Sequence, residues 1–131
     1  MHVLVIQINV NKACYAIRSI KPFLSVDILR MIYFSYVHSV MSCGIIFWGN
    51  SHHSNSIFKI QRRIIRIITN TGSRDSCRHL FKQLQILSLP SQYISHYLFL
   101  LTRIEVYFYP ILNFMILIHV STTTYIYLLQ T

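Results

Sequence analysis

The sequence contains only three acidic residues, Asp27, Asp75 and Glu105, which lie far apart along the chain. Two-metal phosphoryl transfer requires several carboxylates clustered around the cations. The number of acidic ligands therefore excludes polymerase chemistry by this chain alone. Its three glycines also form no glycine-rich phosphate-binding loop, and no cofactor is expected.

Cys77 is the one candidate nucleophile, because the basic neighbours Arg74, Arg78 and His79 could lower its pKa. The surrounding apolar spacing places Cys77 on the inner side of a helix, so we interpret it as an inert core thiol. Trp48 could stack on a base, but its neighbours Phe47 and Gly49 favour a place in the core.

Cysteine and histidine residues offer the only candidate metal ligands, which are Cys43, His52, His53, Cys77 and His79. They lack the C-x2-C or H-x3-H pairs that are typical of zinc sites, so no metal site is predicted. The three cysteines form an odd set without paired spacing, which favours reduced thiols in an intracellular protein of the nucleus or cytoplasm.

The most informative stretch runs from Ser56 to Gly72 and is strongly amphipathic. At 3.6 residues per turn its isoleucines and Phe58 fill one half of the helix, while its basic residues fill the other half. Ser56 is expected to cap the start, and Gly72 is expected to end the helix in a left-handed conformation. The apolar half must pack on other helices, and the cationic half must face water or an anion.

Positive charge is concentrated around this stretch. The formal net charge is +9, and the region from Lys59 to Lys82 contains seven basic residues against the single acid Asp75. A field of this kind suits a polyanion, either nucleic acid or an anionic membrane surface. The predicted nucleic-acid-binding residues are Lys59, Arg62, Arg63, Arg66, Arg74, Arg78 and Lys82.

Repeated helical spacing and short links predict an all-α fold, a small bundle of about four to five helices. The alternation from Leu4 to Val10 favours a strand, so residues 1–10 are expected to form a short strand-like N-terminal extension. Residues 11–104 are expected to form the helical domain. A helix over about 25–42 is apolar nearly all round and is predicted to be central and buried.

Residues 105–131 form a hydrophobic tail, which carries no charge after Glu105. The tail is about long enough to cross a bilayer through residues 106–129. Pro110, Asn113, His119 and a Ser-Thr-Thr-Thr cluster interrupt it, and a buried or disordered tail is the alternative.

Five segments occur in an order that resembles a known family. They are NKACYAIRSIKPFL (11–24), LRMIYFSYVHSVMSCGIIFWG (29–49), IQRRIIRII (60–68), RDSCR (74–78) and LSLPSQYI (87–94). Together they resemble the segment after the palm in reverse transcriptases of jockey-type non-LTR retrotransposons, which are transposable elements encoding an RNA-directed DNA polymerase. The resemblance covers about Asn11 to Arg103 and departs at Cys43, where the family usually has an aromatic residue before the glycine.

The resemblance implies a thumb and connection fragment, whose helices pack on the palm and grip a template–primer duplex. The palm, as the missing packing partner, and its Tyr-x-Asp-Asp turn would precede Met1. The chain is thus expected to be non-catalytic and to bind nucleic acid through the phosphate backbone, without reading sequence. Two alternatives stay open: a small basic membrane-associated protein, and a translated pseudogene product without selected function.

Overall fold

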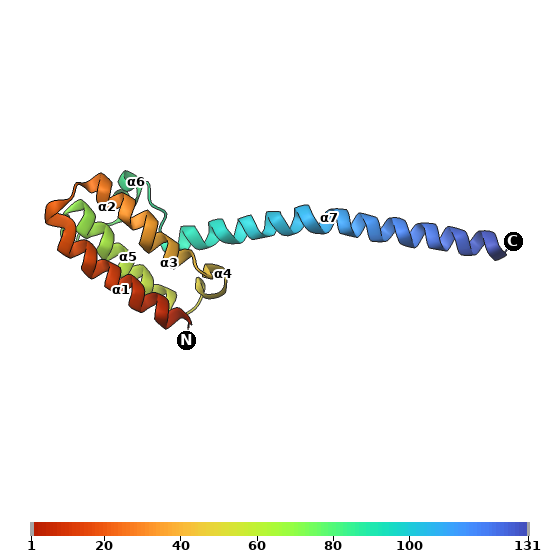
Figure 1. Cartoon of the computed structure of the whole chain (residues 1–131), viewed down its shortest axis with the longest axis horizontal. Coiled ribbons are helices and arrows are strands. Elements are labelled where there is room, and N and C mark those ends of the chain that lie inside the picture. Colours follow the sequence, from red (N-terminus) through yellow and green to blue (C-terminus); the bar gives the residue numbers. More distant parts are fainter. Residues whose placement is uncertain (1, 131) are drawn as a thin grey trace. The chain divides into compact units, whose positions relative to one another are not determined.

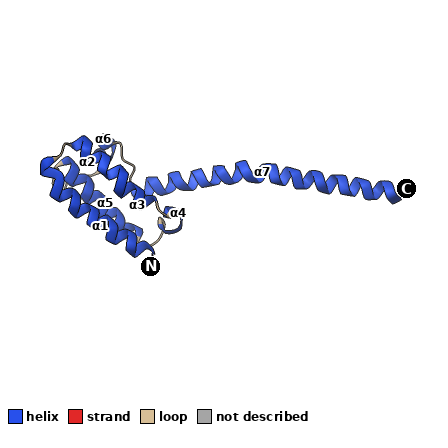
Figure 2. Cartoon of the chain, viewed as in Figure 1, coloured by secondary structure: helices blue, strands red, loops and turns tan. Residues whose placement is uncertain are grey.

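The computed structural model describes the backbone of residues 2–130 and the side chains of residues 2–121. The model is 82% helical and contains no strand within the described residues, so the all-α prediction is confirmed (Figures 1 and 2). The chain divides into two compact units, Met1–His96 and Tyr97–Thr131, which we call the N-terminal unit and the C-terminal unit. When the continuous helical stretch over residues 26–42 is counted as one helix, the described residues form six helices, and about four to five were predicted.

Helix α1 (His2–Ile20) replaces the strand-like extension over residues 1–10 that the alternation from Leu4 to Val10 predicted. That prediction was wrong because the residues that become buried recur at helical spacing rather than at every second position. The buried face consists of Ile6, Val10, Ala13, Cys14 and Ile17. A strand would have placed Leu4 and Ile8 on the same face as Ile6 and Val10, but Leu4 and Ile8 are about half exposed.

A second helical stretch comprises α2 (Val26–Ile32), the π-helical turn η2 (Tyr33–His38) and α3 (Ser39–Ser42), after the short 3-10 turn η1 (Lys21–Phe23). Its buried residues are spaced by four: Leu29, Tyr33, Val37 and Met41. The prediction of a helix buried nearly all round was wrong. Ile28 and Tyr36 are exposed, so this stretch contributes one stripe to the core.

Helix α4 (Ile45–Trp48) follows Gly44, whose φ of 64° lies in the left-handed region that glycine adopts without strain. Trp48 is buried and its Nε1–H donates to the Cys43 carbonyl over 2.9 Å, which confirms its place in the core.

Helix α5 (Ser54–Thr69) lies beside α1 and packs against it more extensively than any other pair of elements. The two helices run in the same direction (Figure 1), and Lys21, just after α1, meets Asn70, just after α5. The expected ends of α5 were wrong. The helix begins two residues before Ser56, and Asn70 rather than Gly72 takes the left-handed conformation, with φ of 59°. Asparagine tolerates this conformation, so it can end a helix as glycine does.

The buried side chain of Gln61 joins three parts of the N-terminal unit. Its Nε2 donates to the Tyr33 hydroxyl over 2.8 Å and to the Leu87 carbonyl over 2.9 Å, and its Oε1 accepts the Leu89 N–H over 2.8 Å. These bonds connect η2, α5 and the start of α7. They also satisfy a polar side chain that is fully buried among isoleucines.

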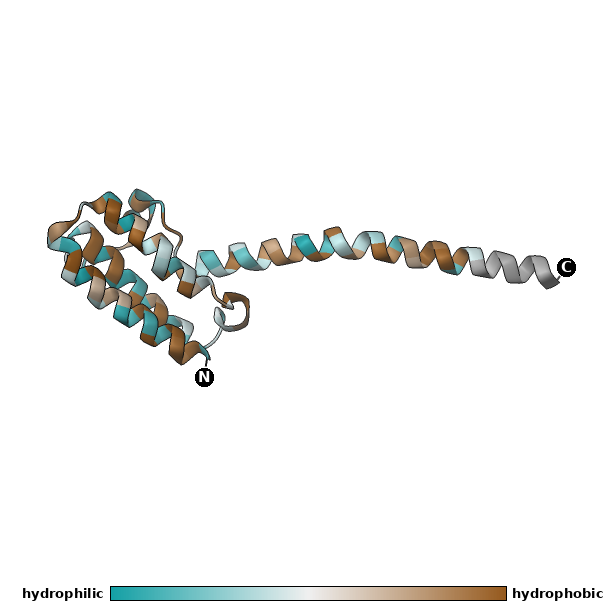
Figure 3. Cartoon of the chain, viewed as in Figure 1, coloured by the Kyte–Doolittle hydropathy of each residue, from teal (hydrophilic) through white to brown (hydrophobic). Residues whose placement is uncertain are grey.

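Two further helices complete the described chain. Helix α6 (Arg78–Leu84) turns Leu80, Phe81 and Leu84 into the core. Helix α7 (Leu89–Gln130) begins in the N-terminal unit, where Leu89 and Gln92 are buried, and continues in the C-terminal unit as far as Gln130. Figure 3 shows hydrophobic residues following one another closely along the later described part of α7.

Candidate functional site

The candidate site is built on the outer side of α5. Its isoleucines Ile57, Ile60, Ile64, Ile65 and Ile68 are buried in the core. The basic residues emerge on the opposite side, where Lys59 and Arg63 are exposed and Arg62 and Arg66 are half-buried. The amphipathic pattern thus predicted correctly which side of α5 presents its cations.

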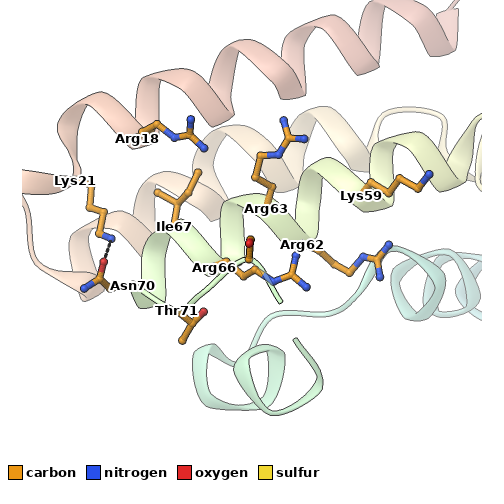
Figure 4. A pocket seen from close by; sticks show the side chains of 10 residues that line it. Arg18, Lys21, Lys59, Arg62, Arg63, Arg66, Ile67, Asn70 and Thr71 are labelled. Carbon is orange, nitrogen blue, oxygen red and sulfur yellow. Dashed lines mark hydrogen bonds between the residues drawn. The ribbon is translucent and has the colours of Figure 1, made fainter. Parts of the chain in front are cut away.

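A groove of about 620 Å³ lies along this cationic side, which we call the α1–α5 groove. All four basic residues of α5 line it (Figure 4). Arg18 from α1 and Lys21 from η1 line it from the other side. The described residues that line the α1–α5 groove thus supply six cations and include no aspartate or glutamate.

Arg18 and Lys21 were missed as site residues by sequence reasoning, although the excess of positive charge near them was visible. They lie about forty residues before the α5 cluster, and only the packing of α1 along α5 brings the two groups together. The helical spacing of Cys14 and Ile17 indicates that Arg18 lies outside the core, but it does not show which helix Arg18 lies beside.

A second groove, of about 870 Å³, lies between α5 and α6, and we call it the α5–α6 groove. Arg62 and Arg66 line both grooves, while Arg74, Arg78 and Lys82 line this one only. All seven residues that the sequence singled out therefore line two adjoining grooves. The single acid in the lining is Asp75, whose carboxylate accepts the Gly72 backbone N–H over 3.0 Å.

Contacts with the rest of the protein hold several of these cations in place. The Arg66 guanidinium donates to the Asp75 carbonyl through Nε and Nη2, over 3.2 and 3.0 Å. The Arg62 guanidinium lies 4.7 Å from the centre of the Phe58 ring. Lys21 Nζ donates to Asn70 Oδ1 over 2.7 Å, as the dashed line in Figure 4 shows. The acceptors Asp75 O and Asn70 Oδ1 are neutral, so the positive charges of Arg66 and Lys21 stay uncompensated by these bonds.

Arg63 and Arg18 also act electrostatically on Cys14, a buried thiol of α1. Burial raises the pKa of Cys14, and the positive charges of Arg63 and Arg18 oppose that shift without overcoming it. Cys14 is thus a protonated core thiol at neutral pH. The opposing effect nevertheless shows that the fields of the two arginines converge on the same part of α1.

Not every arginine of the N-terminal unit belongs to these grooves. The Arg30 guanidinium donates to the Leu84 carbonyl and lies 5.0 Å from the centre of the Phe34 ring. Arg30 therefore caps the end of α6, where a positive charge complements the helix dipole.

The remaining candidates for chemistry form no site. Cys77 is buried, and its Sγ approaches the Arg62 carbonyl at 3.8 Å, which confirms a core thiol. Within the described residues, no three histidine, cysteine or acidic side chains lie close enough together to hold a metal ion.

Comparisons with known proteins add no relative. No family model, curated protein or solved structure matched the chain.

Proposed function

We propose that this chain binds the phosphate backbone of nucleic acid through the two grooves beside α5, as a non-catalytic helical fragment of a non-LTR retrotransposon reverse transcriptase. The observation that carries the proposal is the convergence of nine cations from α1, η1, α5, α6 and the link before α6. They line two adjoining grooves whose described lining contains one acid.

A polyanion is the ligand that such a surface favours. A concave surface with charges of one sign focuses its field and concentrates counter-ions, so a chain of phosphates gains more than a single anion. Six of the nine cations are arginines, and the guanidinium group of Arg66 already donates to the Asp75 carbonyl. The planar guanidinium groups of the other five can each donate two parallel hydrogen bonds to one phosphate: Arg18, Arg62, Arg63, Arg74 and Arg78.

An interface of this kind positions the nucleic-acid backbone but does not recognise the base sequence. Phosphate contacts fix register and orientation, whereas base edges or stacked bases are needed to read sequence. The best candidate for stacking, Trp48, is buried in the core. The proposed binding is thus independent of sequence, and the resemblance to the thumb favours a template–primer duplex as the natural ligand.

The test compares two single substitutions that remove the same charge from exposed positions. Arg63→Ala removes a cation from the α1–α5 groove, whereas Lys12→Ala removes one from outside both basic grooves. Binding of the whole chain to a fluorescent duplex is followed by anisotropy, in a non-ionic detergent that keeps the apolar part of α7 soluble.

We expect Arg63→Ala to weaken binding to every duplex sequence. The slope of log K against log salt concentration should also become smaller in magnitude by about 0.9, because one phosphate contact is lost. Lys12→Ala is expected to bind like the wild type. Equal effects of the two substitutions would mean that net charge rather than the groove attracts the duplex, and would overturn the proposal.

A further inference from the structure

We propose that α7 enters a lipid bilayer from Val106 onward, so that the chain is anchored in a membrane with its basic unit at the lipid surface. This inference concerns the C-terminal unit and does not depend on nucleic-acid binding by the N-terminal unit. It commits to lipid, rather than to a protein partner, as the material that surrounds this helix.

Length and composition satisfy the first requirement of a span. Leu89–Ser121 is long and apolar enough to cross a membrane, and none of its most apolar window is buried within the structure. The uncharged part continues as helix over residues 106–130, a length of about 37 Å at 1.5 Å per residue. The hydrocarbon core of a bilayer is about 30 Å thick, so this part is sufficient with some tilt.

The distribution of exposed side chains distinguishes lipid from a protein partner. From Phe114 to Ile118 five consecutive large apolar residues are each between 48% and 67% exposed. Five consecutive residues pass all the way round a helix of 3.6 residues per turn. A groove or a partner helix covers only a stripe on one side. Lipid covers every side at once.

Residues at the start of the uncharged part match a membrane boundary. The Arg103 guanidinium lies 5.0 Å from the centre of the Phe99 ring, and its Nη1 donates to the Tyr107 hydroxyl over 3.4 Å. Tyr109 follows within the same turn. Aromatic rings together with an arginine that keeps its charge in the headgroup layer are typical of the interface between lipid and water.

The hydroxyl of Ser121, within the proposed span, has the backbone partners that a polar group in a membrane helix requires. The Ser121 hydroxyl donates back to the Leu117 carbonyl at 2.8 Å, with the Ile118 carbonyl at 3.0 Å. This satisfies the hydroxyl without water. Pro110 lies inside α7, and proline is tolerated in membrane helices more readily than in soluble ones.

The distribution of charge predicts the orientation. All twelve lysines and arginines of the chain lie at or before Arg103, and none follows it. Segments rich in lysine and arginine stay on the cytoplasmic side, where the leaflet is anionic. The N-terminal unit is therefore expected on the cytoplasmic side of the membrane, beside the anionic leaflet.

The test uses the whole chain with preformed vesicles of phosphatidylcholine, with or without phosphatidylserine, followed by flotation. We expect the chain to float with both kinds of vesicle and to stay bound after washes with high salt and alkaline carbonate. Proteinase K is expected to digest the N-terminal unit and to leave a peptide containing residues 111–120 protected until detergent is added.

Leu117→Arg places a charge in the middle of the apolar stretch, and Gln83→Arg places the same charge on the exposed surface of α6. Leu117→Arg is expected to reduce the carbonate-resistant fraction about tenfold or more, and Gln83→Arg to leave it unchanged. Flotation only with phosphatidylserine and release by salt would indicate surface adsorption and overturn the proposal. The proposal would also be overturned if the chain sedimented as an assembly without lipid. Equal carbonate-resistant fractions for Leu117→Arg and Gln83→Arg would overturn it as well.

Discussion

Replacement of Gln61 by leucine tests the central connection of the N-terminal unit. Leucine has a similar volume but cannot accept from the Leu89 N–H or donate to the Tyr33 hydroxyl and the Leu87 carbonyl. Tyr33 and Leu89 are buried, so at least two polar groups lose their partner where water cannot replace it. Each such loss costs about 1–3 kcal/mol, which predicts a decrease of about 2–6 kcal/mol in the free energy of unfolding.

The assay is urea denaturation of the whole chain in a non-ionic detergent, followed by the fluorescence of Trp48. Trp48 is the only tryptophan of the chain and is buried in the N-terminal unit, so it reports on this unit. Gln83→Leu on the exposed surface of α6 is the matched control and is expected to change stability by no more than about 0.5 kcal/mol. If Gln61→Leu costs no more than Gln83→Leu, the hydrogen bonds of Gln61 do not stabilise the fold as argued.

Two further predictions concern buried groups. Burial raises the pKa of Tyr33 to about 12, an effect that the hydrogen bond from Gln61 partly opposes. The unfolded chain loses this proton first, so the free energy of unfolding should fall between about pH 10 and 12, by up to about 3 kcal/mol. Tyr33→Phe should lose this part of the pH dependence, and parallel curves for the two proteins would contradict the burial argument. Among the three free cysteines, Cys43 is exposed, whereas Cys14 and Cys77 are buried. A thiol reagent should therefore modify one cysteine rapidly in the folded protein, Cys43→Ser should remove that phase, and three equal rates would contradict the packing.

Periodicity was sufficient to predict the helices whose polar and apolar residues segregate clearly. In α5 the isoleucines and the arginines alternate at helical spacing, so its buried and cationic sides followed from the sequence. In residues 1–10 the apolar residues satisfy both a strand and a helix pattern. Packing against α5 decides between them, and that packing involves residues about fifty positions later.

The candidate site was predictable in part for the same reason. The seven basic residues between Lys59 and Lys82 are close in sequence, and the structure places all of them in the two grooves. Arg18 and Lys21 join them only through the parallel arrangement of α1 and α5. The C-terminal end of α5 could not be predicted from the sequence. Both Asn70 and Gly72 can adopt the left-handed conformation that ends a helix, and residue type alone does not decide between them.

The salt dependence of duplex binding by the wild-type chain is the most direct test of the proposed backbone interface. If four to six of the cations in the α1–α5 groove each neutralise one phosphate, a plot of log K against log salt has a slope of about −3.6 to −5.4. Affinity then falls about 150- to 1,800-fold between 50 and 200 mM salt, and it does so equally for duplexes of unrelated sequence. A slope near zero, or an affinity that depends on duplex sequence at constant salt, would contradict a cationic groove that holds phosphates alone.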